Sequence, residues 1–214
     1  MNICERLYDL SLQKAQSVTI DKVSLGVGYT AVKTSDGEIG VSYTYFEKKP
    51  PAPSALDKTV LVLGFSAERI SRQLGSILAN PKLLIVTNGD YKAGMAKSIS
   101  AGMARIDESF DSAMIILGDF PLLNSHIIDQ VLQAYRTSGR GICLPVRDDR
   151  WGHPICLSRR FFDSLMQIEG DTGAREIIKR NWSQVYQFNI GEDGCFFDVD
   201  TQQDMEHLTF KKRL

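Results

Sequence analysis

The chain has 214 residues, of which 43% are hydrophobic and 24% are charged, and its formal net charge is -1. A chain of this length accommodates one domain of about 150 residues plus an appendage, and its composition is that of an ordinary globular protein. There is no basic excess of the kind that holds nucleic acid or an anionic membrane, so neither is expected as a partner.

No apolar run approaches the roughly 18 residues needed to span a bilayer, and the first residues lack the basic and apolar regions of a signal peptide. We therefore expect a cytoplasmic protein. The cysteines form no Cys-x-x-Cys pair, which predicts reduced thiols rather than a zinc site or a disulfide framework. They are Cys4, Cys143, Cys156 and Cys195.

The first part of the chain predicts a helix followed by a β-hairpin. Residues 2–17 carry apolar side chains at helical spacing, as in a short amphipathic helix. Residues 23–31 alternate between apolar and polar, residues 34–38 have turn chemistry, and residues 39–46 return as a second strand.

A linker is predicted next, because three prolines within residues 50–53 cannot belong to a helix or a central strand. Beyond it, apolar runs of strand length alternate with helical patterns, which predicts parallel β-α units and hence an α/β fold. The predicted parts are a helix and hairpin domain over 1–49, a linker over 50–56 and a main domain over 57–214. The predicted strands of the main domain are 59–63, 82–86, 113–117, 141–146, 154–157, 184–190 and 195–199, and its helices are 66–78, 95–106, 125–138, 160–168, 174–181 and one beginning near Thr201.

Asp119 is the first candidate site residue. It follows residues 113–117, an apolar run without a polar side chain, as expected for a strand that is covered on both faces. Gly118 lets the backbone turn and Pro121 ends the ladder, so Asp119 is predicted to lie beyond the carboxyl end of the strand, where open α/β sheets bind ligands. The alternative is that Asp119 only caps the next helix.

A second group of acids follows the predicted strand 195–199. Asp198 and Asp200 would reach the same edge of the sheet as Asp119, and carboxylates from two strands make an oxygen site that suits Mg²⁺ together with substrate phosphates. Such a metal would offset phosphate charge during transfer. The alternative is structural, since Asp200, Thr201 and Asp204 also fit a helix capping box.

Three further stretches contain candidate residues. Residues 88–99 form a loop that opens a helix, whose free N–H groups and Lys97 could hold an anion. His153 precedes a strand and is either a hydrogen-bonding scaffold or a catalyst. Arg175 follows a Gly-Asp-Thr-Gly turn and could face an anionic partner, although Asp171 could instead cap that helix and pair with Arg175.

In this order and spacing, the motifs over about residues 57–205 resemble the molybdenum cofactor cytidylyltransferases and related MobA-like nucleotidyltransferases. The resemblance implies a three-layer α/β/α fold with a mostly parallel sheet that binds an NTP, CTP in the first instance, and Mg²⁺. It also implies transfer of a nucleotide to the phosphate of molybdopterin with release of pyrophosphate. The matching stretches are Thr59 to Gly64, Asn88-x-Asp90-Tyr91-x-x-Gly94-Met95-x-x-Ser98, Leu117-Gly118-Asp119-x-Pro121, Gly152-His153-Pro154, Gly170-Asp171-x-Gly173-Ala174-Arg175 and Asp198-x-Asp200-Thr201-x-x-Asp204.

The same resemblance assigns roles to individual residues. Asp119 and one of Asp198 or Asp200 would hold the metal, and Asp119, Asp200 and His153 are the catalytic candidates. The nucleotide and acceptor would be bound by Gly94, Met95, Lys97, Ser98, Asp171 and Arg175.

The chain departs from the family at its start. Enzymes of this family open with a strand and a Leu-Ala-Ala-Gly-x-Ser-x-Arg-Met-Gly-like loop whose amides and cations hold the triphosphate, and this chain has residues 1–56 instead. Part of that segment, from residue 25 to residue 44, resembles a small domain with an enolase N-terminal-like fold that precedes domains assigned to heavy-metal chelation.

Losing the loop removes several charge-assisted hydrogen bonds, each worth roughly 1.5 to 3 kcal/mol, so reduced activity is expected unless the hairpin or a partner subunit supplies the donors. A homo-oligomer is one such arrangement. Two alternatives remain open: a non-catalytic module that binds metal, nucleotide or pterin in cofactor handling, and a rearranged gene product without selected activity.

Overall fold

The computed structural model describes residues 33–34, 37–38, 41–48, 57–120, 122–201 and 204. The predicted helix 2–17, the first hairpin strand 23–31, the linker 50–56 and the terminal helix beyond Asp204 lie outside the described residues. Within the described part, no helix has the length and apolar character needed to cross a membrane.

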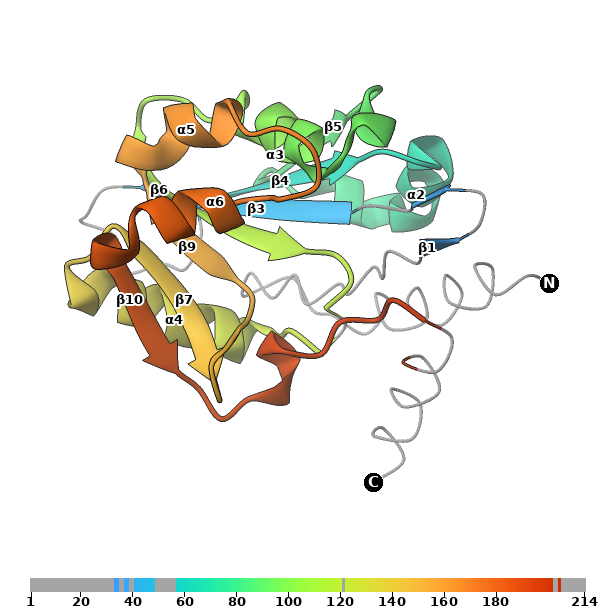
Figure 1. Ribbon diagram of the computed structural model, residues 1–214. Helices are drawn as coiled ribbons and strands as arrows, with labels where there is room; N and C mark the ends of the chain where they lie inside the picture. The colour runs from blue at the N-terminus through green and yellow to red at the C-terminus, as the bar shows by residue number, and fades with distance from the viewer. Residues whose placement is uncertain are drawn as a thin grey trace.

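The centre of the fold is an eight-stranded sheet with the order β10-β7-β9-β6-β3-β4-β5, and β8 pairs with β7 (Figure 1). Five strands, β4, β5, β6, β7 and β10, run in one direction, and β3 and β9 run in the opposite direction. Their bounds are β3 Val41–Lys48, β4 Lys58–Leu63, β5 Leu83–Thr87, β6 Phe110–Leu117, β7 Ile142–Arg147, β8 Arg150–Trp151, β9 Ile155–Ser158 and β10 Val185–Asn189. A separate two-stranded pair is formed by β1 Lys33–Thr34 and β2 Gly37–Glu38.

Helices cover both faces of the sheet (Figure 1). Along β4, Leu61 and Leu63 pack into one buried cluster with α2 and α4, while Val60 and Val62 pack into another with α3, α5 and α6. Successive side chains of a strand point to opposite faces, so a strand that is apolar on both faces needs cover on both. The predicted α/β fold with three layers is confirmed. The helices are α2 Ala67–Leu74, α3 Met95–Met103, α4 Ser125–Ser138, α5 Phe162–Met166 and α6 Arg175–Arg180.

The strand β3 lies inside the main sheet, between β4 and β6 and antiparallel to both. Sequence patterns predict residues 39–46 as a hairpin strand of a separate N-terminal domain, yet residues on both sides of the predicted linker 50–56 are neighbours in one sheet. The backbone groups of two facing strands need a ladder partner between them, and β3 supplies it. The division of the chain into a domain over 1–49, a linker over 50–56 and a main domain over 57–214 stays a prediction.

The direction of β3 matters for the site, because its first residues meet the last residues of its neighbours. Val41 is opposite Leu63 of β4, and Ser42 is opposite Leu117 of β6. The chain therefore enters β3 at the edge of the sheet where β4 and β6 have their carboxyl ends.

The predicted strand 195–199 is wrong. The structure has a short 3₁₀ turn at Asp193–Cys195, followed by irregular chain up to Asp200. Cys195, Phe196 and Val199 are buried, but the backbone of this segment bonds to two loops. The N–H of His153 donates to the Cys195 oxygen (2.9 Å), and the N–H of Val199 donates to the Asp119 oxygen (2.9 Å). The apolar run 195–199 therefore indicates burial of side chains and not pairing of the backbone in a sheet.

Candidate active site

The candidate site lies at the carboxyl edge of the strands that run in the common direction. Asp119 stands two residues beyond the end of β6. His153 stands two residues before β9, which is antiparallel to β6 with Ile155 opposite Ile115, so the start of β9 is beside the end of β6. Both candidates therefore reach the same edge of the sheet, where open α/β sheets bind ligands.

The structure brings the two acidic segments together. The N–H of Val199 donates to the backbone oxygen of Asp119 at 2.9 Å, so Asp198 and Asp200 flank a residue that is bonded to the Asp119 loop. The pKa of Asp119 is raised from 3.8 to about 7, mainly by burial and further by the negative charges of Asp198 and Asp200, while a backbone hydrogen bond opposes the rise. At neutral pH this carboxyl is poised to lose its proton when a cation approaches.

These carboxylates are the residues that could hold a divalent cation. The Oδ1 atom of Asp119 is buried and has no hydrogen-bond partner among the described residues. A buried acceptor without a donor, with two further negative charges nearby, is the electrostatic environment that a metal ion relieves. The described residues contain no group of three or more His, Cys, Asp or Glu side chains arranged to hold a metal. Mg²⁺ commonly takes one or two carboxylates and completes its shell with water and substrate phosphates.

His153 borders the same centre as a neutral imidazole. Its ring centroid is 5.0 Å from that of Phe120, the residue after Asp119, and its Nδ1 atom is buried without a partner among the described residues. Its pKa is lowered from 6.5 to about 4 by burial and by the positive charge of Arg175, against a hydrogen bond with the backbone of Ile115. At pH 7 His153 is therefore uncharged and is suited to hydrogen bonding rather than to charge stabilisation.

The first backbone N–H groups of α3 were expected to be free to bind an anion, but in the structure they have hydrogen-bond acceptors within the protein. The N–H of Met95 donates to Asp171 Oδ1 at 2.9 Å, the N–H of Ala96 donates to the Gly170 oxygen at 3.0 Å, and the N–H of Lys97 donates to Gly94 at 3.2 Å. These amides are engaged inside the protein, because a carboxylate and a carbonyl are themselves favourable at the positive end of a helix. The side chain of Lys97 remains exposed.

The carboxylate of Asp171 therefore caps α3, which is distant in sequence, rather than the helix that follows it. At α6 no side chain caps the first turn, and within the described residues Asp171 forms no ion pair with Arg175. The two loops touch closely, since Gly94 has φ 105° and a Cβ there would lie 2.6 Å from the Gly170 oxygen. A side chain at this position would separate the 170–175 turn from α3.

Asn88 joins the end of β5 to the same helix. Its buried side chain donates to Ser98 Oγ at 3.0 Å and accepts from the N–H of Asp90 at 3.0 Å. Gly94, Met95, Lys97, Ser98, Asp171 and Arg175 thus gather around the entries of α3 and α6. The charge of Arg175 affects His153, which relates this group to the acidic centre.

Thr201 and Asp204 form the reciprocal hydrogen bonds of the capping box that the sequence allows as an alternative. The N–H and Oγ1 of Thr201 approach Asp204 Oδ2 at 2.8 and 2.6 Å, and the N–H of Asp204 donates to Thr201 Oγ1 at 3.2 Å. The N–H of Asp200 also donates to Asp204. Asp204 is therefore occupied with the helix entry, and it fixes the backbone of Asp200.

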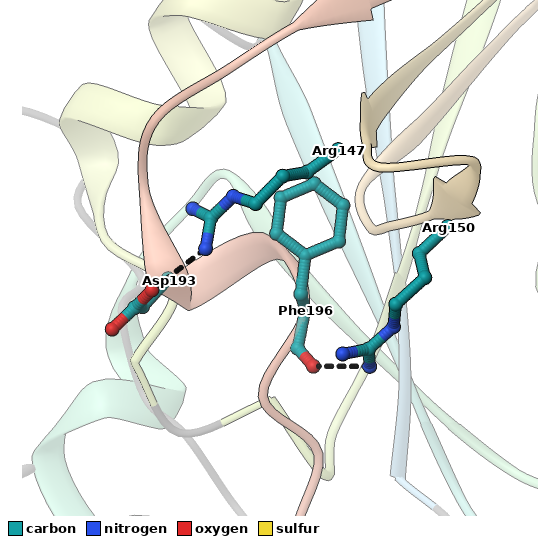
Figure 2. A network of polar contacts seen from close by, with 4 residues as sticks. All are labelled: Arg147, Arg150, Asp193 and Phe196. Carbon is teal, nitrogen blue, oxygen red and sulfur yellow. Dashed lines mark hydrogen bonds and ion pairs between the residues drawn. The ribbon is translucent and has the colours of Figure 1, made fainter.

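Two arginines near the site, Arg147 and Arg150, are not among the residues that the sequence patterns predict. Arg147 ends β7 and Arg150 begins β8, with a two-residue turn between them at Asp148 and Asp149, which have φ 47° and 64°. Arg147 Nη1 lies 2.8 Å from Asp193 Oδ1, and Arg150 Nη2 donates to the Phe196 oxygen at 3.2 Å (Figure 2). The signal for this hairpin was present, as two acids between short β-compatible segments predict such a turn.

The sheet, its helical layers and the acids at its carboxyl edge define an α/β protein of the nucleotidyltransferase fold. Solved structures with this fold align over most of the chain. Rv0371c of Mycobacterium tuberculosis in complex with manganese is 22% identical, with a TM-score of 0.59 over 72% of this chain and 78% of that chain. The 4-diphosphocytidyl-2C-methyl-D-erythritol synthase of Anaerococcus prevotii is 13% identical, with a TM-score of 0.59 over 74% and 79%. A nucleotidyl transferase of Methanothermobacter thermautotrophicus is 14% identical, with a TM-score of 0.58 over 75% and 76%.

The chain itself belongs to the family of MobA-like NTP transferase domains, whose model matches residues 52–185, more than half of the sequence. A comparison with curated proteins finds no match. The match begins within the predicted linker 50–56 and ends at the first residue of β10.

Proposed function

We propose that this protein is a metal-dependent nucleotidyltransferase that transfers a nucleotide, CMP in the first instance, from an NTP to the phosphate of a molybdopterin acceptor. The observation that carries the proposal is the meeting of Asp119 with the 198–200 segment through the 2.9 Å bond from Val199. It gathers acids from distant parts of the chain around a buried carboxylate oxygen that has no partner among the described residues.

In this proposal Asp119 and one of Asp198 or Asp200 would hold Mg²⁺. The metal, when bound, would neutralise phosphate charge during transfer. The raised pKa of Asp119 means that binding of the cation releases a proton near neutral pH, so metal affinity rises with pH up to about 7.

The remaining candidates orient the two substrates. Lys97 is an exposed cation at the entry of α3, where it would attract the triphosphate. Gly94, Met95 and Ser98 would line the nucleotide pocket through side-chain and backbone surfaces other than the engaged amides. His153, neutral at pH 7, would hydrogen-bond the acceptor, and Arg175 would pair with its phosphate.

The family loop that holds the triphosphate is absent from this chain, and the direction of β3 indicates what can replace it. The chain enters β3 at the edge that holds Asp119, and β2 ends at Glu38, three residues before Val41. The missing donors would then come from the residues that precede β3 or from a partner subunit. Without replacement donors, the affinity for the triphosphate falls by about tenfold for each 1.4 kcal/mol of lost binding free energy, and activity falls with it.

The test combines binding with turnover. Calorimetric titration with CTP, GTP and ATP in Mg²⁺ is followed by an assay of pyrophosphate release with molybdopterin as acceptor. We expect CTP to bind most tightly and turnover to disappear in Asp119→Asn, which keeps the shape but removes the charge. Asp163→Asn, an exposed acid of α5, is the matched control and should behave as wild type.

The main competing function is a non-catalytic module that binds metal, nucleotide or pterin. The engaged amides of Met95 and Ala96 favour it, because they remove the donors expected at the entry of α3. Tight binding of a nucleotide without pyrophosphate release would establish this alternative. Absence of both binding and turnover would overturn the proposed function.

A further inference from the structure

The acidic segment 198–200 is not held by a sheet. It follows the 3₁₀ turn Asp193–Cys195 and runs irregularly to Asp200. Toward the β6 loop, its backbone is fixed by the hydrogen bond from the N–H of Val199 to the Asp119 oxygen. After the segment, the N–H of Asp200 donates to Asp204 at 3.2 Å. Contacts to the residues before the segment complete the set that holds it, since a chain without ladder bonds opens at low free-energy cost.

Those contacts come from the β7–β8 hairpin. Arg147 pairs with Asp193 at 2.8 Å, and its guanidinium lies 4.7 Å from the ring centroid of Phe196. Arg150 donates to the Phe196 oxygen at 3.2 Å on the other side of the same residue (Figure 2). The two arginines thus hold Phe196 by its ring and its carbonyl, two residues before Asp198.

The chain after the hairpin continues this contact. Gly152 is buried, and a Cβ there would lie 2.8 Å from the Phe196 Cε1 atom. The N–H of the next residue, His153, donates to the Cys195 oxygen at 2.9 Å. One continuous stretch, from Arg147 to His153, therefore holds residues 193–196 and also delivers His153 to the site.

We infer that Arg147 and Arg150 are positioning residues for the metal site: by clamping Phe196 they set the distance of Asp198 and Asp200 from Asp119. Neither arginine is among the residues proposed to hold the metal or the substrates. The inference rests on the proposed function, because the site it tunes is the proposed one. It adds that the carboxylates alone do not make the site: the clamp on Phe196 is also required to place them.

The chain offers matched controls for both side chains. Arg160 resembles Arg147, with its guanidinium 5.0 Å from the ring centroid of Phe161 and Nη2 at 2.7 Å from Gln184 Oε1. Arg140 resembles Arg150, since its Nη1 donates to the Ser183 oxygen at 2.7 Å. Both controls tie two segments together through the same chemistry, but they lie outside the 193–200 segment.

The first measurement is hydrogen exchange of the Val199 amide in the full chain without ligand. Arg147→Ala and Arg150→Ala should each speed its exchange by about tenfold or more, whereas Arg160→Ala and Arg140→Ala should leave it at the wild-type rate. Unchanged exchange in both site variants would overturn the inference, whatever the protein binds. Arg147→Lys keeps the charge for Asp193 but loses the flat guanidinium over Phe196, so it should give an intermediate rate.

The second measurement is calorimetric titration with Mn²⁺ alone. We expect Asp119→Asn to abolish binding and the two site variants to weaken it by about 10-fold or more, as for other residues that support metal ligands, with the controls unchanged. If wild type binds Mn²⁺, Asp119→Asn does not, and the arginine variants bind like wild type, the inference fails while the metal site stands. If wild type binds no Mn²⁺, the proposed metal site fails, and the exchange rates alone decide whether the arginines position the segment.

Discussion

Replacing Asp119 by asparagine is expected to stabilise the metal-free protein in neutral and mildly alkaline solution. The pKa of Asp119 is raised from 3.8 to about 7 in the folded state, mainly by burial. Between these two values the folded protein keeps a proton that the unfolded chain has released, so each pH unit removes about 1.4 kcal/mol from the free energy of unfolding. Over about three pH units the loss reaches about 4 kcal/mol, and it is complete above about pH 7. Asparagine cannot ionise and does not suffer this loss.

His153 acts with the opposite sign, which determines how the experiment must be read. Its pKa is lowered from 6.5 to about 4 by burial, so between those values the unfolded chain binds a proton that the folded protein excludes. This group makes stability rise with pH in the range where Asp119 makes it fall. The wild-type curve is consequently flattened below about pH 6.5, and only the difference between wild type and Asp119→Asn isolates the carboxyl.

The assay is urea unfolding of both proteins with EDTA, at several values from about pH 4.5 to about pH 8. The advantage of Asp119→Asn should be small at the acidic end and grow to about 4 kcal/mol at the alkaline end. Excess Mn²⁺ at about pH 8 should stabilise wild type by about 2.7 kcal/mol at one hundred times its dissociation constant, and should not affect the variant. Parallel pH curves in EDTA would refute the account of Asp119 as a buried carboxyl strained by its environment.

Three further substitutions test how the site loops are held. Asp171→Ala removes the cap of α3 and should lower the free energy of unfolding by about 1 kcal/mol in urea, while Glu169→Ala should have little effect. Gly152→Ala forces a methyl group against Phe196 and should cost about 1 to 3 kcal/mol by the same measurement, whereas Gly191→Ala, with open space around it, should be tolerated. Asn88→Ala leaves Ser98 and the Asp90 amide without their partner and should cost about 1 to 3 kcal/mol; an unchanged urea midpoint would show that water replaces both bonds.

Local patterns were sufficient for most helices and strands of the main domain, with the segment 195–199 as the exception. The predicted helix 125–138 coincides with α4, because Asn124 caps it by accepting from the N–H of Ile127 and Gly139 ends it with φ 63°. The predicted strand 113–117 lies within β6, since an apolar run bounded by glycine reports burial on both faces. Both signals are contained in a few consecutive residues.

Long-range pairing was not accessible in the same way. The alternation in residues 39–46 predicts a strand but not its neighbours, and β3 pairs with β6, which follows it by more than sixty residues. The apolar run 195–199 carries the same signal as a strand, and only the structure shows that its backbone bonds to two loops. Periodicity reports which face is buried, and it does not identify the partner that satisfies the backbone.

The same division applies to the candidate site. Asp119 follows from local chemistry, because a Gly-Asp after a buried strand places the carboxylate at the sheet edge. The role of Asp171 does not, since its partner Met95 is 76 residues away and belongs to another helix. Arg147 and Arg150 read as ordinary surface cations of a turn until Phe196 is placed between them.

The connections between loops explain why a site can be built here without regular structure. Val199 bonds to Asp119, His153 bonds to Cys195, and Ala96 bonds to Gly170, so each segment with candidate residues is joined to another by a backbone hydrogen bond. Each bond also satisfies a polar group that would otherwise be costly to bury. A change in one loop is therefore transmitted to the next, and substitutions at Arg150 or Gly152 should alter metal affinity without touching a carboxylate. Altered metal affinity in these variants would show that the site depends on the loops along the whole edge of the sheet and not on Asp119 alone.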